Sequence, residues 1–225
     1  MFCLFSRASV ARRELQGREK RAIINLVELN LKSGRALVVV AHPDDETIWM
    51  GGTIIANPKV NWIIFALCKK NDPDRSPRFN QVAKLFNAKG IMTDLEDDDD
   101  RLSIKSLSQM AEKLIIKGLK SKTFDYIFTH AKDGEYGNQR HKGVNQAVSK
   151  LLKNKNISAH SRYCFAYKMH SSDKYAQPKE KSDFLVKLSK NVYKKKIKIV
   201  NDFYGFELNS FESKSCARVE KFNKL

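Results

Sequence analysis

Two short segments of the chain carry residue types that can do chemistry together. The first covers residues 42–46, reads His-Pro-Asp-Asp-Glu, and directly follows an apolar run. The second runs from Thr129 to His141 and follows another apolar run. If both runs are parallel strands of one sheet, their carboxyl ends lie at the same edge, where open α/β sheets bind ligands. The spacing therefore predicts one site built from both segments.

A divalent cation is the first ligand that these residue types indicate. His42 and Asp45 lie three residues apart around a tight turn and can face one cation, with His141 as a third ligand. Two imidazoles and one carboxylate, with a position left open, form a catalytic zinc arrangement. Non-haem iron oxygenases use the same ligand types, so the residues alone leave the metal open. Asp44 is a spare carboxylate that can take a proton from an attacking water.

A helix start is the simpler explanation of residues 42–46. Pro and acidic residues favour the first helical turn, because Pro has no N–H to leave unpaired and acids suit the positive end of the helix dipole. This explains Pro43, Asp45 and Glu46 without any chemistry. It does not explain a histidine at the strand end, directly ahead of two carboxylates.

Alternating strands and helices are expected to position this site. Continuous apolar runs predict strands buried on both faces, and apolar residues at helical spacing predict the helices between them. The order predicts a single Rossmann-like α/β domain, with a mainly parallel sheet and helices on both faces. The predicted strands are residues 36–41, 62–68, 90–92, 124–128 and 162–167, and the predicted helices are 46–56 (interrupted at 51–52), 78–88, 104–119 and 141–152.

The two ends of the chain have weaker patterns. Helical spacing over residues 12–32 predicts a helix, so that residues 1–34 pack as an N-terminal helix on a domain spanning 35–225. Near the other end, residues 184–190 are predicted to be helical. Residues 194–200 fit either a helix or an edge strand.

The two chemistry-bearing segments resemble the motifs of the LmbE-like (PIG-L) family of zinc-dependent de-N-acetylases. Residues 42–46 after a hydrophobic strand resemble the first family motif, and residues 129–141 resemble the second, with glycines and a terminal histidine at matching spacing. Residues 78–86 resemble the family's Arg-x-x-Glu helix, with Gln81 in place of the acid. The resemblance covers about residues 35–150.

This resemblance implies a hydrolase that removes an N-acetyl group from an N-acetylglucosamine-type amino sugar or sugar conjugate. It implies Zn²⁺ bound by His42, Asp45 and His141, with another divalent metal also compatible, and Asp44 as the general base. It also implies that Arg78 reaches the substrate. Zinc polarises an amide carbonyl and lowers the pKa of the attacking water, so that Asp44 can accept the proton and pass it to the leaving amine.

The second segment departs from the family pattern at Asn138. Many relatives carry a histidine there, which is thought to stabilise the oxyanion or to act as an acid. An asparagine can donate a hydrogen bond to an oxyanion but cannot act as an acid, so we expect Asn138 to take only the first role. Tyr136, between two glycines, and His130, at the strand end, are expected to contact the substrate.

Residues 96–100 are five consecutive acids. Contiguous carboxylates cannot converge on one ion without an unusual turn. We therefore expect a solvated loop ahead of the helix at 104–119, from which one acid can still face the cleft.

Charge and composition narrow the range of partners. The formal net charge is +17, and 42% of the residues are hydrophobic, which excludes a wholly disordered polycation. Residues 146–225 hold 18 of the 42 Lys and Arg but only 7 of the 25 Asp and Glu. This segment fits either ordinary surface helices solvated by lysines or contact with an anionic substrate or an anionic surface. The alternative function is a basic polyanion-binding protein with a vestigial metal site. The basic residues lack interleaved aromatics, so no specific nucleic-acid partner is expected.

The apolar runs and the cysteines of the sequence lead us to expect a cytoplasmic protein. No apolar run is long enough to span a membrane, and the apolar start of the chain is too short for a signal-peptide core. Four scattered cysteines indicate neither a disulfide framework nor a cysteine-based zinc site. The expected partner is a small N-acetylated sugar; the sequence indicates no oligomeric state.

Overall fold

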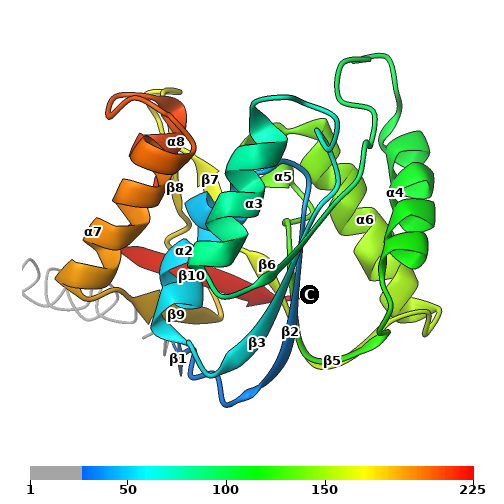
Figure 1. The fold of residues 1–225 in the computed structure, drawn as a ribbon, viewed down its shortest axis with the longest axis horizontal. Helices are drawn as coiled ribbons and strands as arrows, with labels where there is room; N and C mark the ends of the chain where they lie inside the picture. Colours follow the sequence, from blue (N-terminus) through cyan, green and yellow to red (C-terminus); the bar gives the residue numbers. More distant parts are fainter. Residues whose placement is uncertain (1–26) are drawn as a thin grey trace, which may run out of the picture.

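The computed structural model describes residues 27–225, which form an eight-stranded sheet covered by helices (Figure 1). In order across the sheet, the strands are β1 (Val27–Glu28), β9 (Phe184–Lys187), β10 (Val219–Lys224), β6 (Ser158–Phe165), β5 (Thr123–Thr129), β2 (Gly34–Val40), β3 (Val60–Ala66) and β4 (Lys89–Met92). A separate antiparallel pair consists of β7 (Tyr167–Met169) and β8 (Ala176–Pro178). The helices are α2 (Asp45–Ala56), α3 (Arg75–Leu85), α4 (Ile104–Gly118), α5 (Gly134–Gly137), α6 (Gln139–Lys153), α7 (Lys190–Lys198), the π-helix η1 (Ile199–Phe203) and α8 (Phe211–Ser215).

Parallel pairing dominates the sheet, as the sequence predicts. β2 pairs in parallel with both β3 and β5, β3 pairs with β4, and β5 pairs with β6. The last strand, β10, is antiparallel to both β6 and β9. The predicted Rossmann-like α/β class is therefore confirmed, with an antiparallel strand from the C-terminal part of the chain.

Each face of the sheet has its own apolar core. Alternate residues of β2 point to opposite faces, so Val38 and Val40 belong to one cluster of buried side chains, and Leu37 and Val39 belong to the other. The first cluster includes residues of α2, α3 and η1, and the second includes residues of α4 and α6. Figure 1 shows α2 and α3 on one side of the sheet and α4 and α6 on the other.

The two ends of the chain differ from the sequence predictions. Residues 184–187 form strand β9 where a helix was predicted, and residues 194–198 belong to helix α7. Strand β9 pairs with β1 and β10, so tertiary pairing outweighs the local preference for a helix. The N-terminal helix predicted over residues 12–32 lies mostly outside the described residues, and its described end at 27–28 is strand β1.

The chain changes direction across the sheet at β2. From β2 it moves outward to β3 and then β4, and it returns to β5 on the other side of β2. The carboxyl ends of β2 and β5 therefore flank a crevice of the kind in which open α/β sheets bind ligands. The two chemistry-bearing segments follow these two strands.

Helix α2, which begins at the site, is interrupted at Met50, next to the predicted break at Gly51-Gly52. The buried carboxylate of Glu220 accepts hydrogen bonds from the backbone N–H groups of Gly52 (2.8 Å) and Thr53 (2.7 Å), which lie just past the break. Lys196 of α7 donates to the same carboxylate at 2.6 Å, and both side chains are fully buried. This ion pair joins α7, β10 and the interrupted helix.

Lys196→Met is expected to destabilise the chain by about 3–5 kcal/mol, because it leaves the Glu220 charge buried without its cation. Lys195→Met is the matched control: Lys195 is the preceding residue of the same helix and is exposed, so its loss should change stability by less than about 0.5 kcal/mol. Urea unfolding at neutral pH measures both values. Equal effects of the two substitutions would contradict this account of the buried pair.

Candidate active site

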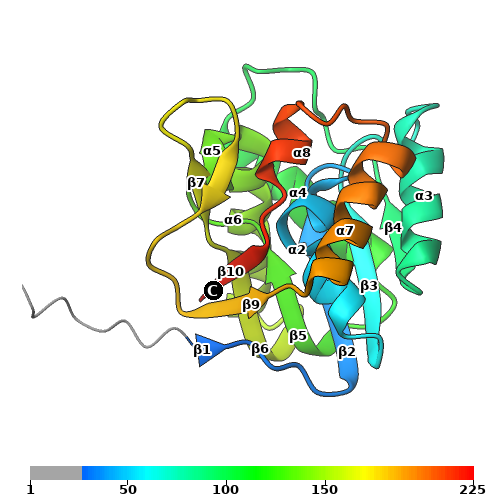
Figure 2. The same ribbon diagram turned by 90° about the vertical axis from the view of Figure 1, so that its left-hand side faces the viewer.

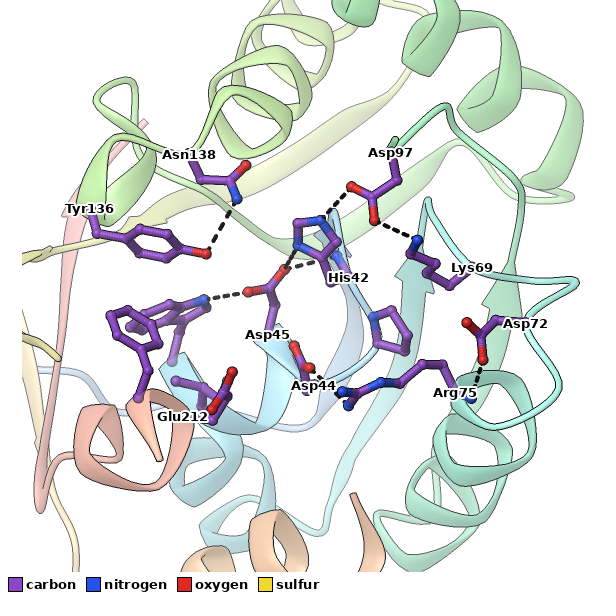
Figure 3. A pocket seen from close by; sticks show the side chains of 14 residues that line it. His42, Asp44, Asp45, Lys69, Asp72, Arg75, Asp97, Tyr136, Asn138 and Glu212 are labelled. Atoms are coloured by element: carbon purple, nitrogen blue, oxygen red, sulfur yellow. Dashed lines mark hydrogen bonds and ion pairs between the residues drawn. The ribbon is translucent and has the colours of Figure 1, made fainter. Parts of the chain in front are cut away.

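A cavity of about 340 Å³ lies beside the carboxyl ends of β2 and β5 (Figure 3). Its volume is near the lower end of the range for small-molecule pockets. Its walls come from the segments that follow β2, β3, β4 and β5 and from helix α8. Figure 2 shows α5 and α8 at the same end of the molecule, which explains how the C-terminal part of the chain reaches this cavity.

His42 and Asp45 line this cavity, and the fully buried third predicted ligand, His141, lies next to them. The Nδ1 atom of His42 lies 3.3 Å from the Oδ2 atom of Asp45 and 3.3 Å from the Nε2 atom of His141. The third side of the triangle, from Asp45 Oδ2 to His141 Nε2, is 3.4 Å. The structure therefore brings His42, Asp45 and His141 together, although 95 residues of the sequence separate the last two.

The size of this triangle fits a single zinc ion. Nitrogen and oxygen ligands that lie 2.0–2.2 Å from a tetrahedral zinc are about 3.3–3.6 Å apart. Each ligand also has the outer partner that metal sites use to orient their ligands. The other ring nitrogen of His141 bonds to Glu135 at 2.6 Å, that of His42 bonds to Asp97 at 3.0 Å, and the Trp49 indole donates to Asp45 at 2.8 Å.

Neighbouring side chains shift the pKa values of Asp45 and His42. Burial raises the pKa of Asp45, but the adjacent His141 and His130 side chains outweigh this and hold it well below its usual range. Burial lowers the pKa of His42, but the hydrogen bonds and charges of Asp45 and Asp97 outweigh this and raise it to about 10. Asp45 is thus ionised at neutral pH, as a metal ligand must be, and a cation competes with a proton for His42.

Asp44 lies in the cavity wall in a strained conformation. Its φ of 140° lies in a region that residues with a side chain rarely adopt, and such strain clusters at functional sites. The Oδ2 atom lies 3.5 Å from the Arg75 guanidinium. Burial and the negative charge of Asp45 raise the pKa of Asp44 well above its usual range, which is the direction that improves a carboxylate as a proton acceptor.

Asn138 joins the cavity to the start of α6. Its side-chain oxygen accepts hydrogen bonds from the backbone N–H groups of Arg140 (2.8 Å) and His141 (3.2 Å), and so caps the helix that carries the third ligand. Its amide nitrogen donates to the Tyr136 hydroxyl at 3.3 Å. Both side chains line the cavity.

His130 lies beneath the cavity instead of in its wall. The residue is fully buried, its Nε2 atom accepts the Ala41 backbone N–H at 2.9 Å, and its Nδ1 atom bonds to Glu135 at 2.9 Å. Because both ring nitrogens have protein partners, the expectation that His130 contacts the substrate is wrong. The histidine instead supports Glu135, which orients His141.

The arginine that reaches the cavity is Arg75, one turn before the predicted Arg78. Arg78 turns away, because its guanidinium donates to Asp74 at 2.6 Å and to the Phe203 carbonyl at 3.0 Å. Arg75 instead packs over the Phe206 ring at 4.5 Å from its centre. Its Nη1 atom, which lies 3.5 Å from Asp44 Oδ2, is buried without a hydrogen-bond partner.

Sequence reasoning missed Glu135 as the partner of His141 and Asp97 as the partner of His42. Both acids follow strand ends at the correct edge of the sheet, which was the available signal. Asp97 is also the one acid of the 96–100 run that lines the cavity. The α8 residues Phe211 and Glu212 line it too, and nothing in their local sequence indicates this role.

The basic C-terminal third contributes no positive side chain to this cavity within the described chain. The Lys and Arg side chains that line the cavity are Lys69 and Arg75, from the first part of the sequence. Residues 146–225 supply Phe211 and Glu212 instead. Among residues 27–225, no helix combines the length and apolar character needed to cross a membrane.

Sequence comparisons identify a related protein and no family model. No family model matches the chain. An uncharacterised protein of Acanthamoeba polyphaga mimivirus is 28% identical over 186 residues, which are 76% of this chain and 75% of that relative.

Solved structures share the fold at low sequence identity. N,N'-diacetylchitobiose deacetylase from Pyrococcus horikoshii has a TM-score of 0.58 at 14% identity, covering 100% of this chain and 94% of its own. A triple mutant of a deacetylase from the teicoplanin biosynthetic pathway has a TM-score of 0.58 at 13% identity, with 82% and 88% covered. GalB, a 4-carboxy-2-hydroxymuconate hydratase from Pseudomonas putida, has a TM-score of 0.53 at 15% identity, with 76% and 79% covered.

The chain therefore has the fold of LmbE-like deacetylases, as the motif resemblance predicts. A hydratase is built on the same fold, so the fold alone does not define the reaction.

Proposed function

We propose that this protein is a metal-dependent amide hydrolase that removes an N-acetyl group from an N-acetylglucosamine-type amino sugar or sugar conjugate. The observation that carries the proposal is the triangle of His42, Asp45 and His141 ligand atoms, with sides of 3.3–3.4 Å, next to the spare carboxylate of Asp44. Zn²⁺ is the proposed cation, and another divalent metal also fits these ligands.

The residues around the trio have separate proposed roles. When bound, the cation would supply a Lewis acid that polarises a carbonyl and lowers the pKa of water. Asp44 would accept the proton of the attacking water and return it to the leaving amine. The Asn138 amide would donate a hydrogen bond to the oxygen that becomes negative, and Tyr136 and Arg75 would contact the sugar.

The intact ligand trio favours catalysis over the alternative of a polyanion-binding protein with a vestigial metal site. A vestigial site would be expected to lose ligands or their outer partners, whereas all three ligands here keep a hydrogen-bonded partner. Contact of the basic C-terminal third with an anionic surface is proposed to occur outside the cavity, because its Lys and Arg side chains do not line it.

Metal analysis combined with an acetate-release assay tests the proposed function. We expect about one divalent ion per chain, and acetate release that a chelator abolishes and added Zn²⁺ restores. The substrate panel should contain N-acetylglucosamine, N,N'-diacetylchitobiose, and phosphorylated and nucleotide-linked N-acetylglucosamine, so that neutral and anionic sugars are compared. Bound metal without acetate release from any member would count against the deacetylase assignment.

A further inference from the structure

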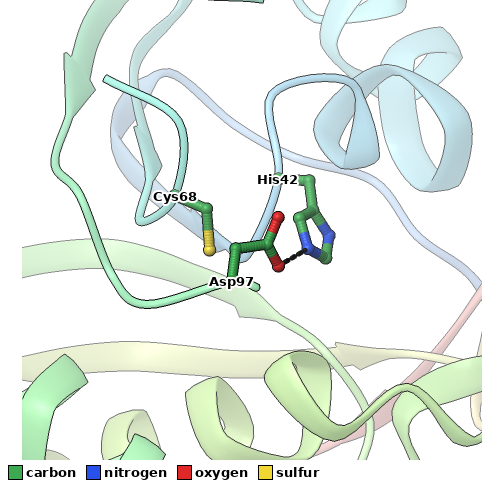
Figure 4. Close-up of side chains that lie close together, drawn as sticks. All are labelled: His42, Cys68 and Asp97. Carbon is green, nitrogen blue, oxygen red and sulfur yellow. Dashed lines mark hydrogen bonds and ion pairs between the residues drawn. The ribbon is translucent and has the colours of Figure 1, made fainter. Parts of the chain in front are cut away.

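The loop between β4 and α4 places Asp97 against the outer side of the proposed ligand His42 (Figure 4). We infer that Asp97 is a positioning residue, which holds the His42 ring so that its Nδ1 atom faces Asp45 and His141. This inference rests on the proposed metal site and adds a residue to it from the acidic run at 96–100.

The hydrogen bonds of the His42 ring determine which nitrogen is free. The Nε2 atom lies 3.0 Å from Asp97 Oδ1, whereas Nδ1 lies 3.3 Å from both Asp45 Oδ2 and His141 Nε2. A neutral imidazole that donates from Nε2 keeps its lone pair on Nδ1. Asp97 therefore selects the tautomer in which the nitrogen that points at the other two ligands can bind a cation.

Two cations keep Asp97 in this place. The Lys69 ammonium lies 3.1 Å from Asp97 Oδ2, and the buried Arg140 guanidinium lies 3.6 Å from Asp97 Oδ1. Arg140 also bonds to Asp100 at 2.8 Å, so two acids of the run are tied to a residue that is adjacent to His141 in the sequence. The acidic loop is thus anchored on the site, and only part of it is simply solvated.

Together with Cys68, the side chains of His42 and Asp97 could instead form a second cation site. The three side chains have potential ligand atoms within 4.8 Å of one another, which would suit a second cation (Figure 4). Lys69 and Arg140 argue against that cation, because two positive groups already lie within 3.6 Å of the Asp97 carboxylate. The geometry and the charges favour Asp97 as a support for His42 over Asp97 as a direct ligand.

Co²⁺ affinity tests this inference without an activity assay. Asp97→Ala should weaken Co²⁺ binding about 10- to 100-fold, measured by competition with a chromophoric chelator, and should alter the Co²⁺ absorption spectrum. Asp98→Ala is the matched control, because Asp98 also pairs with Lys69 at 3.1 Å but is 89% exposed and does not bond to His42. We expect the control to change the affinity by less than about twofold.

Three further results decide between the interpretations. Asp97→Asn keeps an oxygen acceptor and should bind Co²⁺ more tightly than Asp97→Ala; equal losses in both would contradict positioning through the hydrogen bond. Cys68→Ala should leave the affinity unchanged, and a loss as large as that of Asp97→Ala would make both residues direct ligands and overturn the inference. An Asp97→Ala protein that binds Co²⁺ as tightly as the unmodified chain would also overturn it.

Co²⁺ binding by the unmodified chain distinguishes failure of the proposed metal site from failure of this inference alone. An unmodified chain that binds no Co²⁺ contradicts the metal site itself, and the inference with it. If Asp97→Ala does not fold by circular dichroism, Lys69→Met removes one of the two cations that hold Asp97 and should weaken Co²⁺ binding about two- to fivefold. An unchanged affinity in Lys69→Met would then contradict the inference.

Discussion

Asp44→Asn is expected to bind metal as the unmodified chain does while its acetate release falls about 10²- to 10⁴-fold, the usual contribution of a general acid–base residue. Asparagine has nearly the same shape as aspartate, so the cavity wall should keep its form although the ion pair with Arg75 is lost. An amide cannot accept a proton from the attacking water. Metal content by atomic spectroscopy and the initial rate of acetate release measure the two effects separately.

A loss of acetate release without a loss of metal distinguishes a proton acceptor from a metal ligand at Asp44. Asp72→Asn is a suitable control, since Asp72 lies in the same cavity wall but outside the ligand trio. It should leave both metal content and chemistry intact, with at most a weaker apparent affinity for the sugar. If Asp44→Asn retained full turnover, Asp44 would not be the base, and the proposed mechanism would need another proton acceptor.

His141→Ala is expected to weaken metal binding by more than the 10- to 100-fold loss that is typical for an outer partner, because it removes a direct ligand. Thermal unfolding gives a second readout. Zinc at 100 times its dissociation constant should stabilise the unmodified chain by about 2.7 kcal/mol, or roughly 5–10 °C for a chain of this size. The midpoint of the His141→Ala protein should not respond to zinc at that concentration.

Two further histidine substitutions show whether the His141→Ala result is specific to the metal ligands. His42→Ala removes a second ligand at a partly exposed position and should lose the zinc response in the same way. His160→Ala is the control, because its side chain is 84% exposed and it should keep the full response. A zinc response that survives in both ligand variants would place the metal elsewhere.

The sequence predicted the parts of the site that depend on local order along the chain. His42, Asp44 and Asp45 are determined by one strand and the turn after it, so an apolar run followed by their motif was sufficient to identify them. Tyr136, Asn138 and His141 follow the second strand in the same way. A parallel sheet brings the ends of these strands together, so the sequence also predicted that the two segments meet.

The predictions that were wrong, for Arg78 and His130, depend on the direction in which a side chain points. Arg75 and Arg78 lie one helical turn apart, and the carbonyl of Phe203, which is 125 residues from Arg78, holds Arg78 away from the cavity together with the nearby Asp74. His130 sits at the correct strand end, but the backbone N–H of Ala41 occupies its free nitrogen. Neither contact can be read from neighbouring residues.

By itself, then, the sequence determined the α/β class, the edge of the sheet that carries the site and the three candidate ligands, because strand periodicity and strand ends are local properties. Only the tertiary structure decided what surrounds those ligands. Asp97, Glu135 and the α8 residues come from separate segments, and their positions follow from packing and ion pairs between elements. The strand at 184–187 is decided in the same way, since its backbone hydrogen bonds go to β1 and β10.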